Sequence, residues 1–245
     1  MMPRMMPREG GRKTMRIHGL QKLTLLDYPG HTACTVFTAA CNFRCPFCQN
    51  AALVLRPNAQ PEIGEEEFFR FLEGRRGLLE GVCITGGEPT LHWDLPAFAL
   101  RVREAGFDVK LDTNGTDPKM LESLMAAGVV NYVAMDIKSS PERYGVLAGR
   151  EDLDLGPIRE SAALLLEGRI PCEFRTTVVK ELHRREDFEA IGAWLRGAEA
   201  YFLQGFVDSG DLISPGLSAC TREEMESFRQ AALPCIPNTQ LRGVD

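Results

Sequence analysis

The chain has 245 residues, and 44% of them are hydrophobic, which is enough for the core of one domain of ordinary size. Lysine and arginine together number 28 and aspartate and glutamate 34, so the net charge is -6. This acidic balance argues against binding of nucleic acid by bulk electrostatic attraction. No run of 18 apolar residues predicts a membrane span.

The first 15 residues are rich in methionine and proline and lack the apolar stretch of a secretory signal. We expect them to be a disordered or non-native leader. The rest of the chain, residues 16–245, is expected to be a single domain with a short C-terminal extension. Without an export signal, a cytoplasmic location is the default expectation.

Short apolar segments alternate with amphipathic segments along the rest of the chain. Such alternation predicts β-α-β units and a parallel sheet. Proline in the first turn of two expected helices and glycine just past the ends of three support the helix boundaries. The predicted strands are residues 33–38, 82–85, 107–111, 132–137, 173–179 and 201–206, and the predicted helices are residues 65–76, 95–105, 118–127, 157–167, 185–195 and 222–232.

Six β-α units are two fewer than a closed eight-fold barrel contains. We therefore predict an α/β fold with parallel strands in a partial (β/α)6 barrel of the TIM type, with a doubly wound sheet as the alternative. In both folds ligands bind at the carboxyl ends of the strands, and polar motifs follow each of the first four predicted strands. A loop rich in glycine and serine, residues 205–219, is expected to cover one mouth of the barrel.

Cys41, Cys45 and Cys48 form a C-x3-C-x2-C motif after the first predicted strand. Clustered thiols in a chain without an export signal favour a metal or redox site over disulfides. Three thiolates can bind three irons of a four-iron, four-sulfur cluster and leave the fourth iron open to a substrate. The alternative is a structural zinc site, for which His31 or Cys34 would have to supply the fourth ligand.

With Phe47 before its last cysteine, the motif resembles the C-x3-C-x-aromatic-C signature of the radical S-adenosylmethionine (SAM) superfamily. The resemblance extends from about residue 16 onward and implies the radical SAM core fold. It implies that the three cysteines bind a 4Fe-4S cluster and that SAM chelates the open iron. The chain would then be an oxidoreductase that cleaves SAM reductively to a 5′-deoxyadenosyl radical. Phe47 would lie against the adenine, with Gln49 nearby.

The segment Gly86-Gly87-Glu88-Pro89, after the second predicted strand, resembles the GGEP motif of this superfamily. Glycine lacks a side chain and so allows close approach of the backbone to a ligand. The role implied by the resemblance is to hold the methionyl amino group of SAM. By itself, such a segment is also compatible with a plain turn.

Two further motifs resemble those of glycyl radical enzyme activases: DTNG, which begins at Asp112 and includes Asn114, and D-x-K, formed by Asp136 and Lys138. The resemblance implies that these residues line the cofactor. Lys138 would pair with the methionyl carboxylate and Asp136 with the ribose hydroxyls, through charge-assisted hydrogen bonds. Arg175 matches an arginine near the same carboxylate.

Asp112 has two implied roles. It would contact the amino group of SAM, or it would help to hold a monovalent cation together with Thr113 and Asp136.

Residues 20–30, LQKLTLLDYPG, look most like the lead-in of anaerobic ribonucleoside-triphosphate reductase activating proteins. Thr24 stands where serine is usual, and Gln49 where histidine is usual. The resemblance implies that the partner is a glycyl radical enzyme, an anaerobic ribonucleotide reductase, and that a flavodoxin- or ferredoxin-type protein donates electrons. Neither nucleic acid nor a membrane is expected as a partner.

Two other functions stay open from the sequence. One is a radical SAM enzyme that acts on a small molecule, such as a deazapurine synthase. The other is a zinc-binding adaptor without enzymatic activity. Among the remaining cysteines, Cys34 and Cys83 are expected to be core residues.

Overall fold

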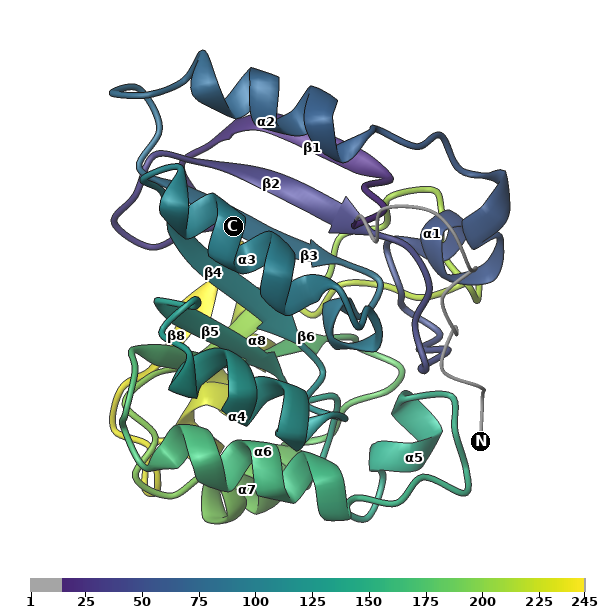
Figure 1. Cartoon of the computed structure of the whole chain (residues 1–245). Helices are drawn as coiled ribbons and strands as arrows, with labels where there is room; N and C mark the ends of the chain where they lie inside the picture. The colour runs from purple at the N-terminus through teal and green to yellow at the C-terminus, as the bar shows by residue number, and fades with distance from the viewer. Residues whose placement is uncertain (1–14, 245) are drawn as a thin grey trace. The chain divides into compact units, whose positions relative to one another are not determined.

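The computed structural model describes residues 15–244 and shows an α/β fold (Figure 1). Of the predicted leader, residues 1–14 lie outside the described residues. The strands are β1 (Gly19–Thr24), β2 (Ala33–Thr38), β3 (Gly81–Gly86), β4 (Asp108–Thr113), β5 (Tyr132–Asp136), β6 (Cys172–Val178), β7 (Tyr201–Gly205) and β8 (Thr239–Arg242). They follow one another in the sheet in chain order.

Parallel pairing dominates the sheet. The pairs β2–β3, β3–β4, β6–β7 and β7–β8 are parallel, whereas β1 runs antiparallel to β2. All six predicted strands are present, and the fold class is confirmed as an α/β fold consistent with a partial TIM-like barrel. The sequence analysis missed β1 and β8.

Each predicted helix is also present. The α-helices are α1 (Ala51–Leu55), α2 (Glu65–Glu73), α3 (Leu95–Glu104), α4 (Pro118–Ala126), α5 (Tyr144–Leu147), α6 (Gly156–Leu166), α7 (Arg185–Trp194) and α8 (Arg222–Ala232), and the 3-10 helices are η1 (Pro57–Ala59) and η2 (Pro89–Leu91). The short helices α1 and α5 were not predicted. Gly106, Gly128 and Gly168, predicted just past three helix ends, have φ values of 94°, 64° and 69°. These left-handed conformations suit glycine at a helix C-terminus.

The described chain packs as two compact units. The first holds the residues up to Asn42 and Ala52–Val133, and the second holds Phe43–Ala51 and the residues from Ala134 onward. The boundary therefore falls inside the cysteine motif. The single domain expected from residue 16 stays a prediction. Within residues 15–244 no helix has the length and apolar character needed to cross a bilayer.

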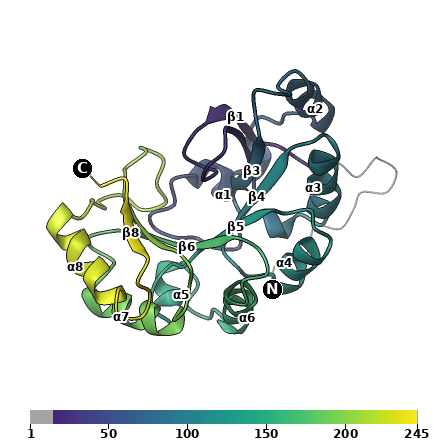
Figure 2. The same cartoon turned by 90° about the vertical axis from the view of Figure 1, so that its left-hand side faces the viewer.

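In the first unit, β2, β3 and β4 present an apolar face and a polar face. The apolar face includes Val36, Ile84 and Val109, which are fully buried, and α2 and α3 lie beside these strands (Figure 2). In the register of the sheet, Thr35 lies beside Cys83, and Cys83 beside Lys110. The opposite face of the strands is therefore lined by polar side chains.

The second unit shows the same division on β6, β7 and β8. Phe174 and Leu203 are buried on one face, and α7 and α8 lie together beside these strands (Figure 2). The register places Arg175 beside Phe202, and Gln204 beside Arg242. Charged and polar side chains again share the face opposite the apolar one.

Candidate functional site

Two glycines shape the turn that follows β3. Gly86 has a φ of 112°, and a Cβ atom on Gly87 would lie 1.9 Å from the carbonyl oxygen of Ala40. The Gly87 N–H donates to Thr38 O and the Glu88 N–H donates to Ala40 O, both at 2.8 Å. The GGEP turn is thus bonded to the segment that leads into the cysteine motif, and only glycine fits at position 87. Binding of SAM by Gly86 and Gly87 stays a prediction.

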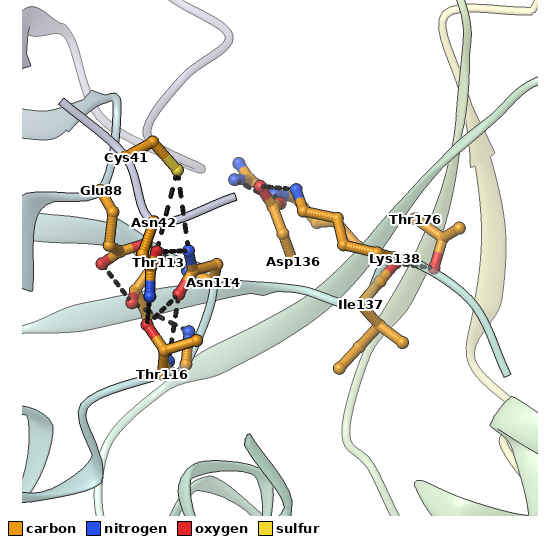
Figure 3. Close-up of polar contacts among 12 residues, drawn as sticks. Cys41, Asn42, Glu88, Thr113, Asn114, Thr116, Asp136, Ile137, Lys138 and Thr176 are labelled. Carbon is orange, nitrogen blue, oxygen red and sulfur yellow. Dashed lines mark hydrogen bonds and ion pairs between the residues drawn. The ribbon is translucent and has the colours of Figure 1, made fainter. Parts of the chain in front are cut away.

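The carboxylate of Glu88, which Figure 3 shows beside Thr113 and Asn114, is 1% exposed and accepts four hydrogen bonds. Thr90 donates twice, from its N–H at 3.1 Å and its hydroxyl at 2.6 Å. The Thr113 hydroxyl donates at 2.8 Å and the Asn114 N–H at 2.7 Å. Burial raises the pKa of the Glu88 carboxyl, although these donors oppose the shift. Glu88 therefore joins the turn after β3 to the turn after β4, and a direct contact with SAM stays a prediction.

An amide network surrounds Cys41 in the first unit (Figure 3). The side-chain amide of Asn114 lies 3.9 Å from the Cys41 sulfur and donates to Asn42 Oδ1 at 2.8 Å. Asn42 in turn donates to the Thr116 hydroxyl at 2.7 Å. The DTNG motif therefore provides an N–H donor beside a predicted cluster ligand. Asn42 and Thr116 were not singled out in the sequence, although Asn42 lies within the cysteine motif itself.

Asp112, the first residue of DTNG, forms an ion pair with Lys110. The Lys110 ammonium is 2.7 Å from Asp112 Oδ1, and the lysine side chain is 1% exposed. Lys110 also donates to the backbone carbonyl of Asp27, and the Asp27 carboxylate accepts from the Thr35 hydroxyl at 2.5 Å. The lead-in segment is thereby joined to the DTNG strand through a buried lysine. Lys110 was missed because it lies within a predicted strand and outside the motifs that the sequence analysis identified.

Cys45 and Cys48 lie on a turn in the second unit. The Cys48 N–H donates to Cys45 O at 3.0 Å, and the Arg44 N–H donates to Ala148 O at 2.8 Å. Burial raises the pKa of the Cys45 thiol to about 11, against the opposing effect of the Lys138 charge. Burial also raises the pKa of the Cys48 thiol. The positive charge of Lys138 thus favours the thiolate form of Cys45, which is the form that binds a metal.

The loop after β7 packs on the cysteine turn. Gln49 donates from its amide to Val207 O at 2.7 Å, and the Ser209 hydroxyl donates to Gln49 O at 3.4 Å. The Ser214 N–H donates to Pro46 O at 2.9 Å. The loop rich in glycine and serine therefore contacts the segment that holds the last two cysteines, and Gln49 forms part of that contact.

Asp136, Lys138 and Arg175 form one charged cluster in the second unit, of which Figure 3 labels Asp136 and Lys138. The Lys138 ammonium is 3.1 Å from Asp136 Oδ2, and Arg175 reaches Asp136 Oδ1 from Nε at 3.0 Å and from Nη2 at 2.9 Å. Burial alone would raise the pKa of Asp136, but the two cations lower it to about 2. Asp136 in turn raises the pKa of Lys138, against the effect of burial. The structure thus brings these three predicted SAM contacts together, and their contact with SAM stays a prediction.

Phe47 is 5% exposed and lies edge-on to His183, with 6.2 Å between the ring centroids. His183, to which the sequence assigned no role, accepts from the Val179 N–H at 3.1 Å and bonds to Lys138 O at 3.0 Å. Burial lowers the pKa of His183, which agrees with a neutral ring protonated on Nε2. His183 therefore supports the backbone at Lys138, and the predicted contact of Phe47 with adenine stays a prediction.

The other cysteines lie outside this arrangement. Cys34 and Cys83 are fully buried, as expected of core residues, and in the part of the chain that the structure describes none of the eight cysteines forms a disulfide. His31 bonds to Pro29 O at 2.9 Å, stacks on Tyr28 and lies 3.4 Å from Asp108 Oδ2, so its contacts are with the lead-in and the start of β4. Within residues 15–244 no three histidine, cysteine or acidic side chains form a ready-made metal site. Cluster binding is therefore predicted from the spacing of the three thiols.

The residues present fit an iron–sulfur cluster and SAM by their chemistry. Three thiols stand at a cluster-binding spacing, an amide donor lies beside the Cys41 sulfur, and the charge of Lys138 acts on Cys45. Hydrogen bonds and charges near the sulfurs are the features that tune such clusters. Lys138 and Arg175 offer cations to a carboxylate, and Asp136 offers oxygen acceptors to hydroxyl groups.

Comparison with known proteins agrees with this chemistry. Residues 35–195 match the Radical SAM superfamily. Two proteins of Methanocaldococcus jannaschii that are provisionally named glycyl-radical enzyme activating enzymes are similar to the chain. One is 29% identical, covering 94% of this chain and 96% of its own length, and the other is 33% identical, covering 71% and 67%. A solved domain of pyruvate-formate lyase-activating enzyme from Bacteroides vulgatus has a TM-score of 0.54 and 16% identity, covering 66% of this chain and 99% of that domain.

Proposed function

Because this chain belongs to the radical SAM superfamily, we propose that it binds a 4Fe-4S cluster through Cys41, Cys45 and Cys48 and activates a glycyl radical enzyme. Membership of the superfamily implies the cluster and SAM as cofactors. When bound and reduced, the cluster supplies the electron that splits SAM into methionine and a 5′-deoxyadenosyl radical. The chain's own residues bind and orient the two cofactors.

The SAM-binding residues divide into two groups, one in each unit. In the first unit, Gly86 and Gly87 offer backbone groups to the methionyl amino group, and Asp112 offers a carboxylate to the same group or to a monovalent cation. Glu88 and Asn114 hold these turns in place and, in this proposal, also contact SAM. In the second unit, Lys138 and Arg175 bind the methionyl carboxylate and Asp136 binds the ribose, while Phe47 and Gln49 line the adenine.

One observation supports the proposal most strongly. In each unit a cysteine of the motif is associated with residues proposed to bind SAM. The Asn114 amide lies 3.9 Å from the Cys41 sulfur, and the charge of Lys138 opposes the rise that burial causes in the pKa of Cys45. Both associations involve side chains and are not part of the backbone hydrogen bonding of the sheet. SAM would bind at the open iron, so residues that hold SAM would be expected beside the cluster ligands.

The proposed partner is an anaerobic ribonucleotide reductase that carries a glycyl radical. The lead-in, residues 20–30, supports the choice of a ribonucleotide reductase, whereas the names of the two archaeal relatives support a glycyl radical enzyme in general. A hydrogen atom would be taken from a glycine Cα of the partner. A flavodoxin- or ferredoxin-type protein is proposed as the electron donor, and the cytoplasm as the location.

The cofactor half of the proposal is tested on anaerobically purified protein supplied with iron and sulfide. We expect broad absorbance near about 400 nm, typical of iron–thiolate charge transfer. With a strong reductant and SAM, 5′-deoxyadenosine should appear by chromatography. Protein that binds one zinc per chain and stays colourless would instead support the zinc-binding adaptor.

The partner half is tested by adding candidate glycyl radical enzymes to the reconstituted protein. A ribonucleotide reductase with a C-terminal glycyl loop should develop a glycyl radical signal in electron paramagnetic resonance, and its Gly→Ala variant should not. Deoxyadenosine formation that responds only to a small molecule, with no radical on any partner, would contradict activation of an enzyme.

A further inference from the structure

A second carboxylate lies close to Arg175 in the second unit. Glu173, at the start of β6, has a fully buried side chain, and its Oε1 is 3.9 Å from Arg175 Nη1. Arg175 therefore faces two carboxylates, since it also binds Asp136 at 2.9 and 3.0 Å. The shorter distances show that Asp136 is the main partner of Arg175 in this structure.

Arg242, from the last strand, neutralises Glu173. Its Nη1 and Nη2 reach the two Glu173 oxygens, both at 3.0 Å, in a two-bond pairing of the strong guanidinium–carboxylate type. The guanidinium also lies over the Phe202 ring at 3.7 Å from its centroid. Arg242 is thus held from two sides, and Glu173 has a cation other than Arg175.

The buried Glu173 carboxylate needs a cation nearby. A buried carboxylate without a cation is costly, and nearby groups rearrange to neutralise it. Without Arg242, the nearest cation to Glu173 among the contacts described above is Arg175. A shift of Arg175 toward Glu173 would remove it from Asp136 and change the direction in which its guanidinium points.

We propose that Arg242 is a positioning residue for SAM binding: by neutralising Glu173, it leaves Arg175 free to stay at Asp136 and face the methionyl carboxylate. This inference rests on the proposed role of Arg175 as a SAM contact. It assigns a function to Arg242, to which the sequence analysis gave no role. Arg242 acts through Glu173 and Arg175 and has no direct contact with SAM in this proposal.

The test measures the dissociation constant of SAM by calorimetry on the cluster-loaded protein without reductant, so that no cleavage takes place. Arg242→Met should weaken SAM binding by about tenfold or more, because Arg175 turns to Glu173. The double variant Glu173→Gln/Arg242→Met removes the competing carboxylate as well and should recover most of the lost affinity. Arg242→Lys keeps the charge and should lie between the wild type and Arg242→Met.

Thermal unfolding of the same proteins measures how far each substitution destabilises the fold, and Arg196→Met is the control for loss of an exposed arginine. Together with the SAM affinities, it distinguishes positioning of Arg175 from simple anchoring of β8. If Arg242 only anchors β8, the double variant binds SAM no better than Arg242→Met, and that result overturns the inference. Arg242→Met that binds SAM like the wild type also overturns it. Wild-type protein that fails to bind SAM overturns the proposed function instead, and the inference with it. If Arg242→Met does not fold, the SAM affinity of the double variant decides instead. An affinity near that of the wild type supports the inference, and an affinity below that of Arg242→Lys overturns it.

Discussion

The Glu88 carboxylate accepts a hydrogen bond from the backbone N–H of Asn114 at 2.7 Å, across 26 residues of sequence. This bond connects the GGEP turn to the DTNG turn, and the Asn114 side chain continues the connection to Cys41 and Asn42. Two motifs that are separate in the sequence are therefore one hydrogen-bonded unit around the first cysteine.

Replacing Glu88 with glutamine tests this connection. A glutamine side chain has one oxygen where the carboxylate has two, so its NH2 group would face at least one of the four donors. Unsatisfied or repelled buried donors cost about 2–3 kcal/mol of unfolding free energy. Denaturant unfolding should show this loss for Glu88→Gln, whereas Glu160→Gln, on the exposed side of α6, should change stability little. Equal stability of the two variants would contradict the structural role of Glu88.

Gly87→Ala tests the close approach between the GGEP turn and the segment before Cys41. The added Cβ would meet the Ala40 carbonyl oxygen at 1.9 Å, and a backbone atom cannot rotate away. We expect a loss of about 3 kcal/mol in stability, as in severe overpacking, together with poor cluster incorporation. Gly64→Ala is the control, because its Cβ would have no atom within 4 Å and its φ is -65°. Iron content and thermal unfolding distinguish the two variants.

Cys45→Ala should abolish cluster assembly and SAM cleavage together, because two thiolates cannot replace three at the cluster. The control is Cys83→Ala, which removes a fully buried thiol on β3 outside the motif. That variant should keep its iron, sulfide and visible absorbance, with a modest loss of stability. Full deoxyadenosine formation by Cys45→Ala would refute the ligand assignment.

Asp136→Asn tests the charged cluster through its pH dependence. The pKa of Asp136 is lowered from 3.8 to about 2, so its ion pairs contribute stability above pH 3.8 and lose it as the pH falls through about 2. The side chain is 32% exposed, so solvent screening limits the pH-dependent part to about 1–2 kcal/mol. The stability difference between wild type and Asp136→Asn should be constant from pH 7 to pH 5 and shrink toward pH 2. A stability difference between the two proteins that grows as the pH falls would contradict a lowered pKa of Asp136.

Much of the fold was predictable because its strands and helices differ in period. The helix at Arg222–Ala232 and the strand at Ala33–Thr38 have the predicted bounds, and the remaining predicted elements differ from the structure only near their ends. The sequence hid β1, since three of its six residues are exposed and break the apolar pattern of a strand. It also hid β8, whose four residues are too few to show a period.

The site was predictable as a set of motifs but not as a network. Spacing and resemblance found the cysteines, GGEP, DTNG and D-x-K. They could not show that Glu88 bonds to the DTNG turn, because that depends on the spatial proximity of two strand ends. Lys110, Glu173 and Arg242 were missed for a similar reason, since a charged residue in a short strand gives no sign of which partner neutralises it.

The contacts between Gln49 and the loop after β7 span about 160 residues of sequence, as the bonds to Val207 and from Ser209 show. On a ribosome, the turn with Cys45 and Cys48 is made long before the residues that support it. Its final conformation must therefore wait until most of the chain has been synthesised. Iron and sulfide that arrived earlier would meet thiols on a turn that still lacks these supporting bonds.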